Sequence, residues 1–338
     1  MDDRVPIPAC RPHLSRLTRS HRRRVRTGCT ELAAGSTSGD SASLAGARRA
    51  LGIGGPCFVL LYLSIVSAPL LRADQPAEAS VETEARKKQR EENLKAMEQR
   101  AREMKVHPAG ARPNARAEAG AQLIPQPLFH YTDEPRRILD ASLWGWTSQG
   151  RLLAICKIEN YEAKLHPEGQ WLYCFGSLSR GLVEAEWSDG HRWAAQKPGL
   201  ELAPLPQAPA PAEGRAARLR QMKEIAKRFD ATLIDTPLNR RQQMRLLPRP
   251  LYRYETPAGE MLDGAIFGLT TNGTNPDAIL AVELHKTEAP APKWMFAVAG
   301  MTQGALSVRF DEKEVWTKPY AQTIGSYETW NWFWENAK

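Results

Sequence analysis

The chain repeats itself at an offset of 123 residues, and this repeat restricts its possible folds more than any other feature. Residues 127–131 align with residues 250–254, and residues 138–145 align with residues 261–268. After a gap at one turn, the same offset returns at aromatic and glycine positions. The matched pairs there are Trp171 with Trp294, Gly181 with Gly304, Trp187 with Phe310, and Trp193 with Trp316. The shared order of apolar positions predicts one module of about 70 residues present twice.

Each copy has the pattern of short β-strands. Apolar runs of strand length occur at residues 152–155 and 279–282, bounded by Gly or Asn turns. Val183, Ala185 and Trp187 alternate with acidic residues, as in a strand with one buried face. A single sheet of this kind leaves one apolar face uncovered. We therefore expect the two copies to face each other and close that surface.

The predicted fold is mainly β. It has two tandem antiparallel β modules, each a half-sandwich or small open barrel, packed as a pseudo-two-fold pair with one bridging helix and an N-terminal charged helix. The predicted segments are a basic disordered leader (1–50), a signal peptide or membrane anchor (51–73), a charged helix and linker (74–124), module copy 1 (125–198), a Pro-rich joint and bridging helix (199–249), module copy 2 (250–320) and an aromatic tail (321–338).

Two helices are expected outside the strands. Residues 82–105 are rich in Glu, Lys and Arg, and their apolar positions form one narrow stripe of barely two heptads. This pattern indicates a solvated single helix; an oligomerisation helix is the alternative. A second helix, at about 212–229, has an apolar stripe that should dock on the sheet and bridge the two modules.

The N-terminal region has the composition of a targeting segment. Residues 1–50 have no apolar periodicity, and an apolar run follows at 51–71 with Arg48 and Arg49 before it and Ala73 after it. This order predicts export to the periplasm or the extracellular space. The alternative is an inner-membrane anchor formed by residues 51–71, although the glycines and prolines in the run favour cleavage.

The positive charge of the chain lies in this N-terminal region. Residues 1–73 hold 11 Arg against four acidic residues, whereas residues 74–338 hold 35 basic and 34 acidic residues. A balanced folded region does not predict a nucleic-acid partner. Contact with a membrane is expected only through an uncleaved N-terminal segment.

No catalytic motif is present in the sequence. A phosphate-binding loop, a nucleophile elbow, a paired-His metal motif and a CxxC pair are all missing, so no catalytic residue, metal site or cofactor is predicted. We expect an exported cell-envelope protein with a non-catalytic binding or structural role toward a protein or polysaccharide partner. The alternative is an extracytoplasmic hydrolase whose site is assembled from distant residues between the two modules.

Two kinds of residue are candidates for ligand binding. Asp140 and Asp263 are an acidic position that both copies keep; they could form a paired site, or each could accept backbone donors at a turn. Tryptophans offer flat apolar surfaces that bind sugars or peptides, or they fill a thin core. The candidate tryptophans are Trp144 and Trp146, the latter the best candidate for an exposed surface, and the tail residues Trp330, Trp332 and Trp334. We expect the tail to pack back onto the modules.

Cys156 and Cys174 are the only cysteines after the apolar run. If the hairpin between them is symmetric about Leu165, they lie opposite each other and could form a disulfide in an oxidising compartment. The second copy has Ala297 in place of Cys174, so the module does not require this bridge. Two buried thiols are the alternative.

One resemblance supports export. Residues 246–254, followed by residues 262–265, resemble uncharacterised secreted proteins of planctomycete bacteria, and residues 70–74 resemble the ends of their signal peptides. The resemblance covers roughly residues 50–320. It implies secretion and implies nothing about chemistry.

Overall fold

The computed structural model describes residues 83–110, 120–162, 170–187, 190–235, 238, 240–254, 259–271, 273–288, 291–321 and 329–335. The predicted leader and the predicted signal peptide lie outside these residues. Within the described ranges, no helix has the length and apolar character needed to cross a membrane.

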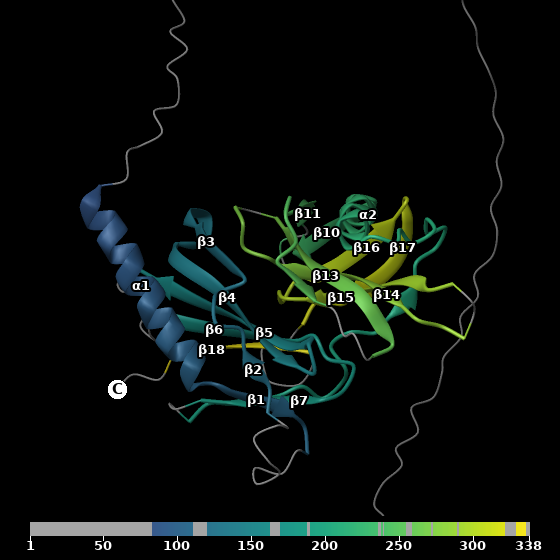
Figure 1. Cartoon of the computed structure of the whole chain (residues 1–338). Helices are drawn as coiled ribbons and strands as arrows, with labels where there is room; N and C mark the ends of the chain where they lie inside the picture. The colour runs from purple at the N-terminus through teal and green to yellow at the C-terminus, as the bar shows by residue number, and fades with distance from the viewer. Residues whose placement is uncertain are drawn as a thin grey trace, which may run out of the picture. The chain divides into compact units, whose positions relative to one another are not determined.

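The described chain is a mainly β protein in which one helix and eight strands occur twice in the same order (Figure 1). The first copy comprises α1 (Glu84–Glu103), β1 (Lys105–Pro108), β2 (Gln122–Leu123), β3 (Phe129–Asp133), the 3-10 turn η1 (Glu134–Arg136), β4 (Ile138–Ser148), β5 (Arg151–Tyr161), β6 (Trp171–Ser177), β7 (Val183–Glu186) and β8 (Arg192–Ala194). The second comprises α2 (Arg215–Lys227), β10 (Phe229–Asp235), β11 (Arg240–Leu246), β12 (Tyr252–Tyr254), β13 (Met261–Thr270), β14 (Ala278–His285), β15 (Lys293–Gly300), β16 (Ala305–Phe310) and β17 (Lys313–Lys318). A short strand follows each copy, β9 (Ala203–Pro204) and β18 (Trp330–Trp334).

The strands of the two copies also pair in the same register. In the first copy, Leu123 of β2 lies opposite Trp146 of β4; in the second, Leu246 of β11 lies opposite Leu269 of β13. Likewise, Trp193 on β8 lies opposite Ala185 on β7, and Trp316 on β17 lies opposite Val308 on β16. Each residue and its counterpart are 123 positions apart, which is the offset of the sequence repeat.

Each repeat begins with its helix, so the repeat is longer than predicted. Thr83 accepts a hydrogen bond from the Arg86 N–H at 3.3 Å and caps the start of α1. Met97, Ala101 and Met104 are then buried in the core of the first copy. Their spacing recurs 125 positions later in Met222, Ala226 and Phe229, which are buried in the core of the second copy.

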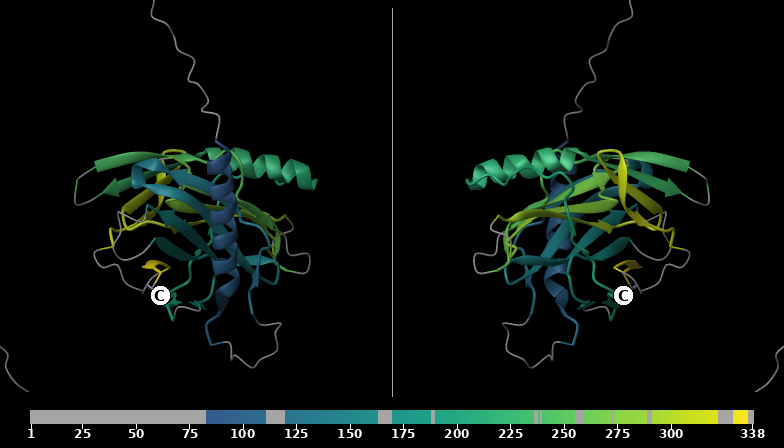
Figure 2. Two further views of the ribbon diagram at one scale, coloured as in Figure 1. Left: turned by 90° about the vertical axis from the view of Figure 1, so that its left-hand side faces the viewer. Right: turned by 90° about the vertical axis from the view of Figure 1, so that its right-hand side faces the viewer.

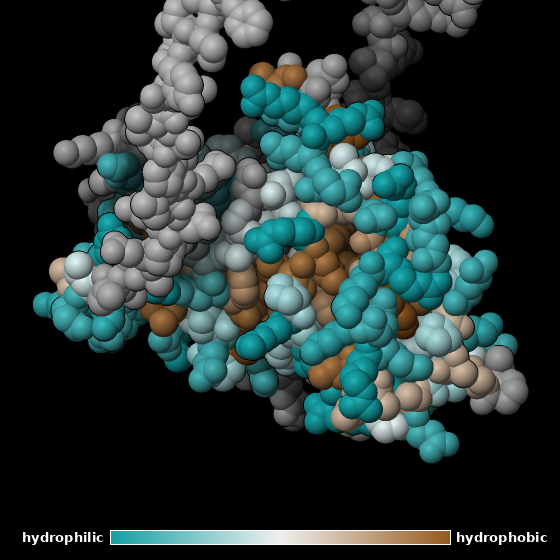
Figure 3. All heavy atoms as spheres, turned by 90° about the horizontal axis from the view of Figure 1, so that it is seen from above, coloured by the Kyte–Doolittle hydropathy of each residue, from teal (hydrophilic) through white to brown (hydrophobic). Residues whose placement is uncertain are grey.

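Both helix predictions are therefore wrong in one respect. The charged helix α1 is not solvated on all sides, because its narrow apolar stripe is buried against β4 and β5. Figure 2 shows the helix running across the strands of the first copy. The helix α2 does not bridge the copies; it packs on β10, β13 and β14 of its own copy. Its basic side chains Arg215, Arg220 and Lys227 are exposed. Seen from above, hydrophilic side chains surround an apolar area (Figure 3).

Each main sheet is curled and buried on both faces. The strand order is β18-β6-β5-β4-β2 in one sheet and β17-β16-β10-β11-β13-β14-β15-β9 in the other, with β3 added to β4 and β12 added to β13. A third sheet has the order β1-β7-β8. One face of each main sheet packs on its own helix. The other faces meet in a shared core that contains Leu143 and Ile155 from one copy and Ile266 and Ile279 from the other. Burial on two faces explains the unbroken apolar runs of the central strands.

The copies exchange the strands that follow them. β9, which follows the first copy, pairs with β15 of the second, and β18, which follows the second copy, pairs with β6 of the first. The hydrogen bonds that end these pairings correspond: Leu205 N–H donates to Trp294 O at 3.0 Å, and Glu335 N–H donates to Trp171 O at 2.9 Å. This reciprocity is that of a pseudo-two-fold pair. It also confirms that the aromatic tail packs back onto the modules.

Candidate functional site

Two buried glutamates occupy equivalent positions at the junction of the copies. Glu159 on β5 lies opposite Ala141, and Glu283 on β14 lies opposite Gly264, which is the counterpart of Ala141. Their side chains are 3% and 0% exposed. Charged groups this deeply buried need hydrogen-bonding partners.

Each glutamate has a tyrosine of its own copy as a partner. The Tyr131 hydroxyl donates to Glu159 Oε1 at 2.7 Å, and the Tyr254 hydroxyl donates to Glu283 Oε1 at 2.6 Å. Burial, followed by the charge of the adjacent glutamate, raises the pKa of both tyrosines well above its ordinary value. Both hydroxyls therefore stay protonated and act as donors.

Each glutamate also has a partner from the opposite copy. Asn275 Nδ2 donates to Glu159 Oε1 at 3.4 Å, and Arg151 Nη2 donates to Glu283 Oε1 at 2.5 Å. Burial alone would raise the pKa of Glu283, but the hydrogen bond to His285, the charge of Arg151 and the hydrogen bond from Tyr254 outweigh it and lower that pKa. These contacts join the two copies at both equivalent places.

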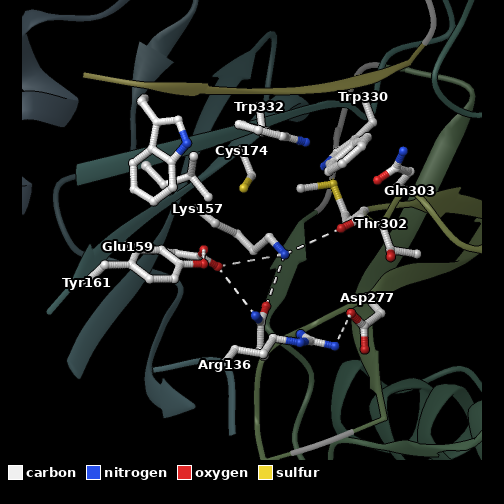
Figure 4. Close-up of a pocket in the computed structure, with 14 residues that line it drawn as sticks. Arg136, Lys157, Glu159, Tyr161, Cys174, Asp277, Thr302, Gln303, Trp330 and Trp332 are labelled. Atoms are coloured by element: carbon white, nitrogen blue, oxygen red, sulfur yellow. Dashed lines mark hydrogen bonds and ion pairs between the residues drawn. The ribbon is translucent and has the colours of Figure 1, made fainter. Parts of the chain in front are cut away.

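A pocket of about 390 Å³ opens beside Glu159, between the two copies (Figure 4). Lys157 lies in it with a side chain only 4% exposed. Its Nζ donates to Asn275 Oδ1 at 3.0 Å, Pro276 O at 3.2 Å and Met301 O at 3.4 Å, and it lies 3.9 Å from Glu159 Oε1. The ammonium thus has partners for its charge and its donors within the protein.

A second ion pair lies on another side of the pocket. Arg136 Nη2 is 3.0 Å from Asp277 Oδ1, and Arg136 Nη1 is 3.3 Å from Asp133 Oδ2. Asp277 also accepts hydrogen bonds from the Thr271 hydroxyl at 2.7 Å and the Thr271 N–H at 3.1 Å. Burial raises the pKa of Asp133, although the charge of Arg136 opposes it.

Aromatic rings of β18 form the remaining wall. Trp330, Trp332 and Trp334 alternate along the strand and line the pocket, and all three are partly exposed. The ring centroids of Trp332 and Trp334 are 6.4 Å apart, and those of Trp334 and Tyr161 are 5.1 Å apart, both edge to face. We call this set of four side chains the aromatic wall.

The equivalent place in the other half of the molecule has a different chemistry. By strand register, Ala281 takes the position of Lys157, and His285 takes that of Tyr161. Pro204 likewise takes the position of Trp334. Leu202, which directly precedes β9, is two residues before Pro204, just as Trp332 is two residues before Trp334, so it corresponds to Trp332. The copies therefore keep the Tyr–Glu pair and differ in the groups that face the pocket.

The structure brings together only some of the predicted site residues. Trp330, Trp332 and Trp334 meet in the pocket. Trp144 and Trp146 are each 1% exposed and belong to the core under α1. Trp144 and Trp146 thus fill the core, which was the alternative to a binding surface, and Trp146 is not the exposed surface for which it was the best candidate.

Asp140 and Asp263 are not joined by any contact among the described residues. Asp140 lies on β4 with His130 Nε2 at 2.7 Å from its Oδ1. Asp263 lies on β13 and accepts hydrogen bonds from Arg253 at 2.9 and 2.6 Å and from Arg218 at 2.7 Å. Burial alone would raise the pKa of Asp263, but these hydrogen bonds outweigh burial and lower that pKa. Both aspartates lie in strands and bind side chains, so the expected backbone turn contacts are not the reason for their recurrence.

The disulfide between Cys156 and Cys174 is not formed. Cys156 lies opposite Phe175, and Cys174 lies opposite Lys157, one residue away from the symmetric hairpin that we expected. A shift of one residue turns the two thiols to opposite faces of the sheet. Cys174 lines the pocket, where burial raises its thiol pKa and keeps it protonated at neutral pH.

The Tyr–Glu pairs were missed in the sequence. The tyrosines align at the offset of 123, but the glutamates are 124 apart because of the gap at the preceding turn. The described residues contain no group of three or more His, Cys, Asp or Glu placed to hold a metal ion. Comparison of the chain with protein-family models, curated proteins and solved structures finds no match.

Proposed function

We propose that this chain is an exported, non-catalytic binding protein whose ligand site is the pocket between the two copies. The observation that carries the proposal is the difference between two equivalent places. One has the tail tryptophans and Lys157, and the other has Leu202, Pro204 and Ala281. The Tyr–Glu pairs at the junction are kept in both halves, whereas the partly exposed tryptophans of the pocket are present in one half alone.

The pocket groups argue for binding and against catalysis. A general acid or base must be able to reach a substrate proton. Glu159 is saturated by Tyr131, Tyr161 and Asn275, at 2.7, 3.0 and 3.4 Å. The lining residues given by the described chain include no histidine or serine, and the Cys174 thiol is protonated. A hydrolase with a site between the modules remains the second candidate, since a pocket lies where it requires one.

The binding proposal is tested with the whole chain and two variants. Trp332→Leu places in the pocket the residue found at the equivalent position, and Trp316→Leu removes a partly exposed tryptophan outside it. A thermal-shift screen against a mixed library of small molecules should find ligands that stabilise the wild type and Trp316→Leu, but not Trp332→Leu. Ligands that stabilise all three proteins equally would place the site elsewhere.

Export rests on the sequence pattern before residue 74. Protein recovered from the extracytoplasmic fraction should begin near Asp74 when its N-terminus is sequenced. Finding the intact leader on soluble cytoplasmic protein would contradict export.

A further inference from the structure

We infer that the pocket takes an uncharged saccharide unit. This inference rests on the proposed function and names its ligand class. Three features of the pocket carry it: the aromatic wall, the cations already paired with carboxylates, and the hydrogen-bonding groups of three lining residues.

The aromatic wall places apolar ring surfaces along one strand, with neighbouring rings turned edge to face. Trp330, Trp332 and Trp334 lie at every second residue of an edge strand, so their rings share one side of β18. Rings fixed by edge-to-face contacts lose little entropy on binding. A pyranose has an apolar face of C–H groups and a polar circumference, and it matches such a surface.

Each cation of the pocket is already paired with a carboxylate. Lys157 faces Glu159, and Arg136 faces Asp277 and Asp133, so each cation has a carboxylate within 4.0 Å. A charged ligand would have to separate one of these pairs, and breaking a buried pair is costly. An uncharged ligand leaves them intact.

In the part of the chain that the structure describes, three residues lining the pocket have hydrogen-bonding capacity that other residues do not use. The buried Trp330 Nε1 has no hydrogen-bond partner in the described chain. Gln303 Nε2 donates to Ala321 O at 3.0 Å, which leaves the amide oxygen as an acceptor. Thr302 Oγ1 accepts from the Gly304 N–H at 3.3 Å and keeps its own hydrogen to donate.

The test titrates the whole chain with saccharide trimers while tryptophan fluorescence is recorded. Neutral probes are cellotriose, maltotriose, xylotriose, mannotriose and N,N′,N″-triacetylchitotriose. Charged probes are trigalacturonic acid and the glucosamine trimer. At least one neutral trimer should change the emission saturably, and Trp332→Leu should weaken that binding about tenfold, the order expected for one lost aromatic face. Trp316→Leu should bind as the wild type does.

The outcomes separate this inference from the proposed function. Suppose that Trp332→Leu weakens binding only of charged trimers, or only of non-saccharide compounds from the thermal-shift library. The pocket is then a binding site, and the inferred ligand class is wrong. If no compound binds in a way that Trp332→Leu weakens, both the site and its ligand class are wrong.

Discussion

Replacing Arg151 by Met should destabilise the protein by removing one contact between the copies. Arg151 is 19% exposed and its Nη2 lies 2.5 Å from Oε1 of the fully buried Glu283. Removing one partner of a buried ion pair costs roughly 3–5 kcal/mol. Tyr254 and His285 still bind Glu283 in the variant, at 2.6 and 2.7 Å, so we expect a loss near the lower end, about 3 kcal/mol.

This loss should depend on pH in a defined direction. The pKa of Glu283 is lowered in the folded wild type, so its stabilisation is present above the ordinary Glu pKa of about 4.3 and is lost as the pH falls through the lower folded value. Without Arg151, burial is opposed only by Tyr254 and His285, and the carboxyl takes up its proton at a higher pH. The difference in stability between the two proteins should therefore shrink from pH 7 to pH 4.

Urea unfolding followed by tryptophan fluorescence measures both effects. The control is Arg192→Met, because Arg192 and Glu186 form an exposed pair at 3.7 Å with side chains 82% and 41% exposed. Loss of such a pair should cost less than about 1 kcal/mol. If Arg151→Met unfolds at the same urea concentration as this control at pH 7, the Arg151–Glu283 contact does not hold the copies together.

Two further predictions concern the tail and the cysteines. Truncation after Ser326 removes β18, uncovers β6 and should lower the melting temperature clearly, by circular dichroism; an unchanged value would show that the strand adds nothing to the fold. In a variant shortened to begin at Asp74, Cys156 and Cys174 should resist a thiol reagent when folded and give two free thiols when unfolded without reductant; no free thiol would reveal a disulfide.

The repeat and the strand pattern were predicted from the sequence because they depend on local periodicity. Continuous apolar runs require two buried faces, and a pair of facing sheets provides them. The helices were misread for a physical reason. Only one narrow stripe of α1 is buried. The matching stripe of α2 lies 125 residues later, whereas the strands repeat at an offset of 123 residues. A mostly charged sequence with such a narrow apolar stripe is typical of a helix exposed to solvent.

The candidate site could be predicted only in part. The tail tryptophans were chosen for their density, and the structure places them together on the pocket. Glu159 was missed because one residue of insertion hides its match with Glu283, and Lys157 was missed because its counterpart is Ala281, so the repeat does not mark it. Trp146 was chosen as the best candidate for an exposed surface because its counterpart is Leu269, but both positions are buried. Which residues of two copies meet depends on packing between them, and no local pattern encodes that.

The exchange of terminal strands between the copies builds the pocket, and one engineered cysteine tests whether it occurs. Trp332 on β18 lies directly opposite Cys174 on β6. Hydrogen-bonded pairs occur at every second position of this antiparallel ladder, and their bonds include Ser177 N–H to Thr329 O and Glu335 N–H to Trp171 O. Trp332 and Cys174 therefore form a non-hydrogen-bonded pair. Such pairs have Cα atoms about 4.5 Å apart, within the range for a disulfide.

Trp332→Cys should therefore form a disulfide with Cys174 under mild oxidation, detected by mass spectrometry of non-reduced peptides. Phe333→Cys is the matched control: it lies opposite Tyr173 and its side chain points to the other face of the sheet, so it should leave Cys174 unbridged. A disulfide in the first variant and none in the second is the predicted result. Bridging of Cys174 by Phe333→Cys, or by neither variant, would contradict the exchange of strands that builds the pocket.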